Sequence, residues 1–345
     1  MPVAHRFLFN FAASYSSGGY KRLYEYARWF DAHGGAWFVI HPQCRGLQGE
    51  FAANRFFTVE QSQLRRLYDD CGYLRAIERE IGTPQLYYSY GIPLYARFGT
   101  VNWFHLSNVL PLGAAQAPLT VLDRLRFGFL GRRIRAGFRH ADVISAESDY
   151  SLGLIGAGHA SKLVLSVNGS DDELAFLSSN HRESPGDTAV VVGTYRYKAL
   201  AESVRVFQVL RGSNSRLKLL IAGNEAWIPK GLRGLQDVVV LGNLPRSELV
   251  ARLRRSKFYI STTYVENSYN AASEGVFCAD ESYISDIGPH QELLTNMPVE
   301  RVRLPGLPRP LLHVKRDSLS GTNLKSWDTV VAGMISEFNK VFPGR

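Results

Sequence analysis

The chain has 345 residues, of which 45% are hydrophobic and 21% are charged, and its formal net charge is +9. At about 150 residues per domain, this length excludes a single ordinary core and predicts two domains of a globular enzyme. The positive charge favours an anionic partner: a nucleic acid, an anionic membrane or a phosphorylated substrate. No apolar run reaches the roughly 20 residues that span a bilayer, and Phe7–Ala13 lacks the length and cleavage site of a signal peptide. We therefore expect a cytoplasmic protein.

The first half of the chain alternates short β-rich runs with amphipathic stretches, as parallel βαβ units do. The runs that predict strands are Phe7–Phe11, Trp37–His41, Gln85–Tyr90, Val101–Leu106, Val143–Ala146 and Leu163–Val167. Helices are expected between them at Tyr20–Asp31 and Gln61–Ile81. The polar segment Asn168–Asp187, which contains Asn-Gly, Asp-Asp and Ser-Pro-Gly, is predicted to be a linker.

The same alternation continues after this segment. Strands are predicted at Ala189–Val192, Leu217–Ala222, Val238–Leu241, Phe258–Ser261 and Tyr283–Ser285, and helices at Ala199–Leu210, Arg246–Arg255, Asn270–Ala279 and Leu324–Phe342. Unbroken apolar strands are typical of parallel sheets that are buried on both faces. We therefore predict an α/β protein with two Rossmann-like domains, 1–180 and 181–320, and a C-terminal helical segment, 321–345, that could return to the first domain. Ligands of such sheets bind beyond the carboxyl ends of the strands, so a cleft between the domains is the expected active site.

Two glutamates, Glu266 and Glu274, lie eight residues apart after the predicted strand Phe258–Ser261. The first is expected on a loop and the second in a helix. A carboxylate accepts two hydrogen bonds side by side, which suits the vicinal diol of a sugar or a ribose. The helix start between them offers backbone N–H groups and a positive dipole end to phosphates. Taken alone, the two residues could also be solvated glutamates at chance spacing.

A second candidate group is the predicted strand-to-helix turn 193–198, which contains Gly193, Arg196 and Lys198. The glycine permits close approach of the backbone to a ligand, and the two cations could neutralise a departing diphosphate. An ordinary turn is the alternative interpretation. Further along, Ser285–Leu294 predicts a strand end, a Gly-Pro turn and the start of a helix.

These features occur in one order over Gly193–Leu294. In that order the second half resembles the donor domain of a retaining GT-B glycosyltransferase of family 4, which includes mannosyl- and rhamnosyl-type transferases of polysaccharide and O-antigen synthesis. The shared features are a glycine followed by arginine and lysine, the Glu-x7-Glu element, and a Ser-Asp-hydrophobic-Gly segment before Glu-Leu. The resemblance implies the GT-B fold, in which two Rossmann-like domains face a central cleft.

The resemblance also implies roles for individual residues. Glu266 would contact the donor sugar, Glu274 the ribose hydroxyls, and Arg196 and Lys198 the diphosphate. The family's Gly-Phe-Gly-Leu between the glutamates is replaced here by Asn-Ser-Tyr-Asn. In the second half of the chain, the other donor-binding candidates are Gly193 and the four residues of this loop, Asn267, Ser268, Tyr269 and Asn270. Because asparagine supplies side-chain amides where glycine offers only backbone, the identity of the donor sugar stays open.

The first half resembles the family more loosely. Gly18 and Gly19 follow the first predicted strand, where relatives keep a glycine pair near the donor phosphates; an ordinary strand-to-helix turn is the alternative. His105 ends the strand Val101–Leu106 and is the candidate for the histidine that relatives place near the reacting sugar. A histidine whose bonds are satisfied inside the fold is the alternative.

The resemblance implies a retaining, metal-independent enzyme with no cofactor besides the nucleotide-sugar donor, linked to GDP, UDP or dTDP. Transfer would occur on the front face, with a diphosphate oxygen accepting the proton of the acceptor. The sequence agrees with this, because no Asp-x-Asp follows a predicted strand and the scattered cysteines lack the spacing of a zinc site. Asp69-Asp70 and Asp171-Asp172 are interpreted as solvated acids.

The acceptor is expected to be a glycan or lipid-linked glycan, which would receive a hexose or deoxyhexose in surface polysaccharide synthesis. Arg124–Arg139 mixes six arginines with aromatic and aliphatic residues on a predicted helix. Such a helix can lie on an anionic membrane, here the inner face of the plasma membrane, or pack its apolar face in the domain and point its arginines outward. The internal glycines weaken it.

Three other interpretations remain. An epimerase-like GT-B enzyme would need an acid/base pair that the sequence does not reveal, and it would turn over without an acceptor. A non-catalytic homologue would bind a nucleotide-sugar only. A nucleic-acid-binding protein could use the basic surface, but no recognition motif supports it, and we expect no nucleic-acid partner.

Overall fold

The computed structural model describes residues 6–60, 72–113, 117–178, 185–319 and 323–342. The chain divides into two compact units. Unit 1 comprises Met1–Ala114, Val121–Gly169 and Lys325–Arg345, and unit 2 comprises Ala115–Thr120 and Ser170–Leu324. The first boundary thus lies at Gly169, earlier than the position near residue 180 expected from the sequence.

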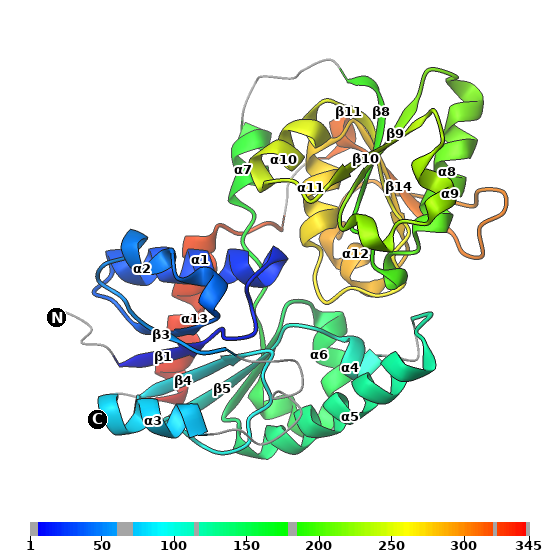
Figure 1. Ribbon diagram of the computed structural model, residues 1–345. Coiled ribbons are helices and arrows are strands. Elements are labelled where there is room, and N and C mark those ends of the chain that lie inside the picture. Colours follow the sequence, from blue (N-terminus) through cyan, green and yellow to red (C-terminus); the bar gives the residue numbers. More distant parts are fainter. Residues whose placement is uncertain (1–5, 61–71, 114–116, 179–184, 320–322, 343–345) are drawn as a thin grey trace. The chain divides into compact units, whose positions relative to one another are not determined.

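Unit 1 is built on a seven-stranded parallel sheet with the strand order β3-β2-β1-β4-β5-β6-β7 (Figure 1). The strands are β1 (Phe7–Asn10), β2 (Trp37–Ile40), β3 (Arg55–Thr58), β4 (Leu86–Tyr90), β5 (Val101–Leu106), β6 (Val143–Ala146) and β7 (Leu163–Leu165). Its helices include α1 (Ser17–Ala32), α2 (Leu47–Glu50), α3 (Gly72–Ile81), α4 (Leu110–Gly113), α5 (Val121–Gly137) and α6 (Asp149–Ile155). The six predicted strands are confirmed, whereas the half-exposed edge strand β3 was not predicted. Within the predicted helix Gln61–Ile81, the positions before Gly72 lie outside the described residues.

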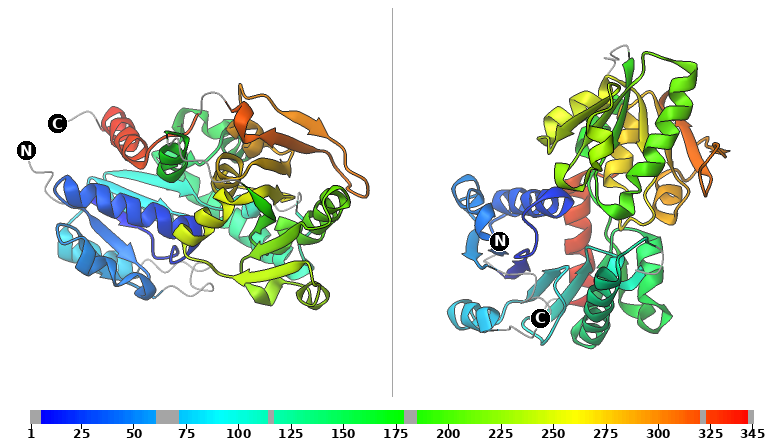
Figure 2. Two further views of the ribbon diagram at one scale, coloured as in Figure 1. Left: turned by 90° about the horizontal axis from the view of Figure 1, so that it is seen from above. Right: turned by 45° about the vertical axis from the view of Figure 1, so that its right-hand side comes forward.

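The C-terminal helix α13 (Trp327–Val341) belongs to unit 1 and lies with its blue and cyan elements (Figure 2). The Ser326 hydroxyl caps it by accepting from the Thr329 N–H, and the apolar positions at helical spacing are buried. Gly169 makes room for the first turn, because a Cβ there would lie 2.4 Å from Cγ of Trp327. Gly169, the last residue of unit 1 before the chain enters unit 2, therefore allows α13 to pack on unit 1 where the chain returns to it.

Unit 2 has a second seven-stranded sheet, ordered β10-β9-β8-β11-β12-β14-β13. The strands are β8 (Gly186–Val192), β9 (Lys218–Ala222), β10 (Val238–Gly242), β11 (Ser256–Ser261), β12 (Glu281–Ser285), β13 (Glu300–Val302) and β14 (Leu311–Lys315). The helices are α7 (Asp171–Ser178), α8 (Leu200–Ser213), α9 (Lys230–Arg233), α10 (Arg246–Arg254), α11 (Asn270–Cys278) and α12 (Gly288–Leu293). The five predicted strands are confirmed and are parallel. The antiparallel pairs β12–β14 and β14–β13 were not predicted.

The predicted linker Asn168–Asp187 is wrong in its first part, because α7 forms there. Three acids begin this helix, where negative charge favours the N-terminal dipole. Glu173 is only 2% exposed and accepts a hydrogen bond from Ser273 of α11 at 3.0 Å. Its neighbour Asp172, interpreted from the sequence as solvated, accepts from Nε of Arg246 at 2.7 Å. The acidic run therefore packs on unit 2 instead of spanning open solvent.

The arginine-rich helix α5 divides along its length. One face of its C-terminal part is buried, and two glycines of that face are needed: a Cβ on Gly131 would lie 2.1 Å from the Pro111 carbonyl oxygen, and one on Gly137 would lie 2.8 Å from that of Leu94. Its N-terminal part exposes apolar side chains, among them Val121 and Leu122, each 76% exposed. Of the two interpretations of this helix, packing of its apolar face in the domain therefore holds only for its C-terminal end.

Candidate active site in the second unit

An ion pair joins the two candidate segments at the carboxyl edge of the second sheet. β8 and β11 are parallel neighbours, so the chain leaves both strands at the same edge. Lys198 lies on the 3₁₀ turn η6 (Arg196–Lys198) after β8, and Glu266 lies on the loop after β11. The Lys198 ammonium donates to a Glu266 carboxylate oxygen, and the two side chains are 12% and 19% exposed. Burial alone would lower the pKa of Lys198, but the charge and hydrogen bond of Glu266, together with the tyrosines Tyr259 and Tyr195, outweigh burial and raise that pKa.

Two left-handed backbone positions flank Lys198 and fix the turn. Gly193 ends β8 with φ of 88°, and a Cβ there would lie 3.2 Å from Cε of Lys198. Ala199 adopts φ of 50°, an uncommon value for a residue with a side chain, and its carbonyl oxygen accepts from the Thr262 hydroxyl at 2.9 Å. Backbone strain of this kind gathers at functional sites. The predicted glycine therefore has a conformational reason to be there.

Glu274 lies in α11, which packs closely on β11. Gly275 allows this contact, because a Cβ there would lie 2.1 Å from the Tyr259 ring. The Glu274 side chain is 8% exposed and pairs with the guanidinium of Arg246. Glu266, Glu274 and Lys198 all act on the pKa of the buried Tyr259 phenol, which burial raises well above its usual range. Both predicted glutamates thus lie around one tyrosine, each beside a cation.

Arg246 was missed in the sequence. It begins α10, after β10, and also contacts Asp172 and Glu173, the latter at 3.6 Å. The segment Asn243-Leu244-Pro245 before it follows a parallel strand, so the argument that selected Gly193 and Glu266 would also have selected Arg246. The sequence feature that could have identified Arg246 is its position directly after Pro245, at a strand-to-helix turn.

The loop between the glutamates leads into α11. Ser268 and Tyr269 are buried, Asn267 and Asn270 are half-buried, and Asn270 is the first residue of the helix. The Asn270 carbonyl oxygen accepts from the Ser273 hydroxyl at 2.9 Å. All four candidates therefore lie at the N-terminus of the nine-residue helix that carries Glu274.

Arg196 differs from Lys198. Its side chain is exposed, and within the described ranges it forms no ion pair or hydrogen bond. The structure thus brings Lys198, but not Arg196, to the glutamates. Its predicted contact with the diphosphate stays a prediction.

His105 lies in the interior of unit 1, with 0% exposure. Ser145 Oγ accepts from the Trp103 indole N–H at 2.7 Å and lies 2.8 Å from Nδ1 of His105. On the other side, Nε2 lies 3.4 Å from a Glu147 carboxylate oxygen, which also accepts from the Tyr90 hydroxyl at 3.0 Å. Burial lowers the pKa of His105 to about 4. Both ring nitrogens are occupied, which favours the structural interpretation of this histidine over the catalytic one.

A buried arginine completes this polar cluster. Arg22 of α1 is 0% exposed and donates to Asn168 Oδ1 at 3.1 Å and to the carbonyl oxygens of Ser166 and Val167 at 2.8 Å each. Its Nε lies 3.9 Å from Glu147. Burial would raise the pKa of Glu147, but the hydrogen bond from His105 and the Arg22 charge lower it to about 2.

The glycine pair lies in the first turn of α1. Gly19 packs closely, because a Cβ there would lie 3.1 Å from Ser14 and 3.3 Å from the Tyr90 ring. Gly18 is half-buried. Close packing thus explains Gly19, and a contact of either glycine with donor phosphates stays a prediction.

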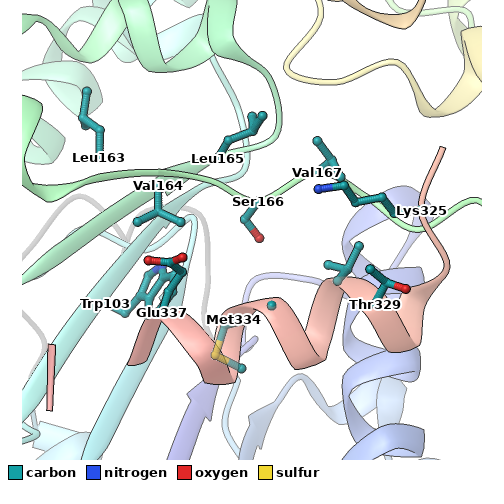
Figure 3. A pocket seen from close by; sticks show the side chains of 12 residues that line it. Trp103, Leu163, Val164, Leu165, Ser166, Val167, Lys325, Thr329, Met334 and Glu337 are labelled. Atoms are coloured by element: carbon teal, nitrogen blue, oxygen red, sulfur yellow. The ribbon is translucent and has the colours of Figure 1, made fainter. Parts of the chain in front are cut away.

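A cavity of about 360 Å³ lies elsewhere in unit 1, between β7 with its following segment and α13 (Figure 3). Its lining includes the apolar side chains of Trp103, Val164 and Met334 and the charged side chains of Lys325 and Glu337. None of the predicted site residues lines it.

Two absences hold for the described part of the chain. No helix there is long and apolar enough to cross a membrane. No group of three or more His, Cys, Asp or Glu residues there has a geometry that could hold a metal ion.

Neither a protein-family model nor a curated protein sequence matches the chain. Solved structures, however, share its fold. HepE from Anabaena, in complex with UDP and glucose, is 13% identical, with a TM-score of 0.52 over 83% of this chain and 82% of that chain. The α,α-trehalose-6-phosphate synthase of Burkholderia multivorans is 12% identical, with a TM-score of 0.54 over 85% and 86%. The UDP-forming synthase of Burkholderia xenovorans, in complex with glucose-6-phosphate, is 11% identical, with a TM-score of 0.54 over 84% and 86%. The chain therefore has the α/β fold with two Rossmann-like domains that defines GT-B glycosyltransferases.

Proposed function

We propose that this protein is a glycosyltransferase that binds a nucleotide-sugar at the carboxyl edge of the second sheet and transfers its sugar to a hydroxyl acceptor. The observation that carries the proposal is the pairing of Glu266 with Lys198 and of Glu274 with Arg246 in segments that follow strands of the second sheet. Carboxylates suit hydroxyl groups and cations suit phosphates. The complex of HepE with UDP and glucose supports it, because that protein shares the fold.

In this proposal the ion pair between Lys198 and Glu266 breaks when the donor binds. Lys198 turns to the diphosphate and offsets the charge that develops when the bond from C1 of the sugar to the diphosphate oxygen breaks. Glu266 accepts hydrogen bonds from hydroxyls of the sugar. The acceptor oxygen forms its bond to C1 on the same face, and its proton passes to the departing diphosphate oxygen, so that the configuration is retained and no metal is needed.

Glu274 would bind the ribose hydroxyls, in exchange for part of its contact with Arg246. The exchange suits this arginine, because Asp172 and Glu173 remain beside it when Glu274 turns to a ligand. Arg246 would then orient the carboxylate without contacting the reacting atoms.

Nucleotide stabilisation tests donor binding. UDP, GDP and dTDP are added separately in differential scanning fluorimetry, and one of them should raise the melting temperature, because it binds the native state only. Glu274→Ala should reduce that rise, whereas the control Glu248→Ala, an exposed residue of α10 that pairs with Arg252, should not. No response to any nucleotide would contradict the proposal. Conversion of UDP-glucose or GDP-mannose without an acceptor would instead indicate an epimerase-like enzyme.

For the acceptor we propose a glycan on a lipid carrier, reached from the surface of an anionic bilayer. The support is the N-terminal part of α5, where Leu122, Leu125 and Phe129 are 76%, 67% and 41% exposed. Arg124 and Arg126 are exposed between them, and Arg133 lies over the Phe129 ring at 5.3 Å. Apolar side chains among arginines suit a membrane surface with acidic headgroups.

Vesicle sedimentation tests this contact. Phosphatidylserine vesicles should bind the protein more strongly than phosphatidylcholine vesicles, and Leu122→Asp with Leu125→Asp should abolish the difference. Leu235→Asp, at a residue of unit 2 that is 46% exposed, is the control. If the double variant bound phosphatidylserine vesicles as strongly as the wild type does, the proposed membrane contact would be contradicted.

A further inference from the structure

A second buried histidine, His290, lies in unit 2 and has one defined tautomer. It belongs to α12, just after the carboxyl end of β12, and is 1% exposed. Its Nδ1 lies 2.7 Å from the Ser285 carbonyl oxygen. A carbonyl oxygen can only accept, so Nδ1 carries the proton and Nε2 carries a lone pair.

This lone pair has no partner. Nε2 of His290 is buried and forms no hydrogen bond within the described ranges. Burial lowers the pKa of the ring to about 4, so Nε2 stays an acceptor at neutral pH. Leaving a buried acceptor unsatisfied is costly, and such a group in a native structure calls for a partner.

His290 lies beside the donor site, because β11 and β12 are parallel neighbours and the segments that carry Glu266 and His290 leave these strands at the same edge of the sheet. The charge of Glu266 favours the protonated form of the His290 ring, and the charges of Lys198 and Arg309 oppose it. His290 thus lies at the edge of the sheet where Glu266, to which we assign the sugar hydroxyls, pairs with Lys198.

Arg309 supplies a hydrogen-bond donor without a partner at the end of β11. Its Nη2 donates to the Thr262 carbonyl oxygen at 2.6 Å, and its guanidinium lies 3.8 Å from the centre of the Tyr264 ring. Its Nε–H is buried and without a partner in the part of the chain that the structure describes. A phosphate oxygen could accept from Arg309 but could not satisfy His290, whereas a hydroxyl group both donates and accepts.

We propose that Nε2 of His290 accepts a hydrogen bond from a hydroxyl group of the donor sugar. His290 is then a specificity-determining residue, which selects donors that carry a hydroxyl at this position of the ring. The inference rests on the proposed function and deepens it, because it names a contact that the sugar makes and the nucleoside diphosphate does not.

Two variants separate the ring nitrogens. His290→Asn places an amide N–H near the position of Nδ1, so it can keep the bond to Ser285 but lacks the acceptor at Nε2. His290→Gln extends to the position of Nε2 and can restore an acceptor there. Calorimetry compares UDP with UDP-glucose, and GDP with GDP-mannose, on the wild type and both variants.

We expect His290→Asn to weaken binding of the sugar nucleotide about tenfold, the effect of about one hydrogen bond, and to leave binding of the nucleoside diphosphate unchanged. His290→Gln should recover part of the loss. Equal effects on both ligands, or no effect on either, would overturn the role of His290 while leaving donor binding intact. Failure of the wild type to bind any of the four ligands would overturn the proposed function itself.

A measurement on the wild type covers the case in which a variant does not fold. With ¹⁵N-labelled histidine, the unprotonated Nε2 resonance of His290 should shift when UDP-glucose or GDP-mannose is added, and not when the matching nucleoside diphosphate is added. The resonance is assigned by its loss in His290→Gln. The same shift with both ligands would contradict the proposal.

Discussion

His105 in unit 1 and His290 in unit 2 are alike in burial and in charge state. They are 0% and 1% exposed, and burial lowers the pKa of each to about 4. They differ at the second ring nitrogen, which in His105 faces Glu147 and in His290 faces no partner that the structure describes. Burial and a low pKa therefore do not separate a structural histidine from a ligand-binding one, whereas the count of filled hydrogen bonds does.

The buried and half-buried cations of the two units follow the same division. Arg22 is enclosed by acceptors from its own unit and is 0% exposed. Lys198 and Arg246 contact carboxylates at a sheet edge, where their side chains are 12% and 33% exposed. We expect substitutions in the first group to change stability and substitutions in the second to change ligand binding.

The largest stability effect is expected for Arg22→Met. It would leave Glu147 as an uncompensated buried charge and the Ser166 and Val167 carbonyl oxygens without their donor. Breaking a buried pair of this kind costs about 3–5 kcal/mol. Urea unfolding of unit 1 measures it. Arg28→Met, at an arginine whose partner Asp328 is 64% exposed, should cost about 1 kcal/mol or less. Equal costs would end the distinction between the two groups.

Lys198→Met should reduce nucleoside diphosphate release by about 10²–10³-fold, because it removes a preorganised charge from the departing diphosphate. Thermal unfolding should change little, since Glu266 keeps some access to solvent. Lys218→Met, at an exposed position of β9, is the control. An activity equal to that of the wild type would exclude Lys198 from the donor site.

Arg196→Met sharpens this result. The resemblance gives both cations one role, but only Lys198 lies against Glu266 in the structure. A loss as large as that of Lys198→Met would show that the exposed Arg196 turns to the diphosphate when the donor binds. A loss of less than about threefold would leave Lys198 as the principal contact.

The sequence predicted the strands well, because buried parallel strands are unbroken apolar runs. Spacing along the chain also predicted that Glu266 and Lys198 follow strand ends and that Glu274 lies in a helix, as they do in the structure, while their roles stay predictions. It failed for α7, since acids that pack on a neighbouring helix look like linker acids until their partners are known. It failed for His290 as well, because a missing hydrogen bond is a property of the folded surroundings and not of a pattern.

The pH dependence of stability should come from both histidines. The pKa of each is about 4 when folded and 6.5 in its ordinary state. The unfolded chain therefore binds more protons between these values, so stability is fully present above pH 6.5 and is lost as the pH falls towards 4. Between pH 7 and pH 5 each histidine should account for about 2 kcal/mol. The pKa of Glu147 is about 2 in the folded protein, so the stability that this carboxylate contributes should be lost only below about pH 4.5.

Urea unfolding at pH 7 and pH 5 measures this loss, and His105→Gln removes one of its sources. The variant should lose about 2 kcal/mol less than the wild type over the same interval, whatever its stability at pH 7. A loss equal to that of the wild type would mean that His105 is protonated in the folded state, in conflict with the lowering of its pKa by burial and by the charge of Arg22.

A further effect on stability is expected at the returning helix of unit 1. In Gly169→Ala the new methyl group would meet the rigid Trp327 ring at 2.4 Å, and overpacking of this kind costs about 1–3 kcal/mol. Gly333→Ala in α13 is the matched control: its Cβ would meet no atom within 4 Å, and it should stabilise the helix by about 0.5–1 kcal/mol. Thermal unfolding measures both. Since Gly169 belongs to unit 1, Gly169→Ala should leave the nucleotide-induced rise in melting temperature intact, and loss of that rise would show that donor binding depends on more than the carboxylates and cations of unit 2.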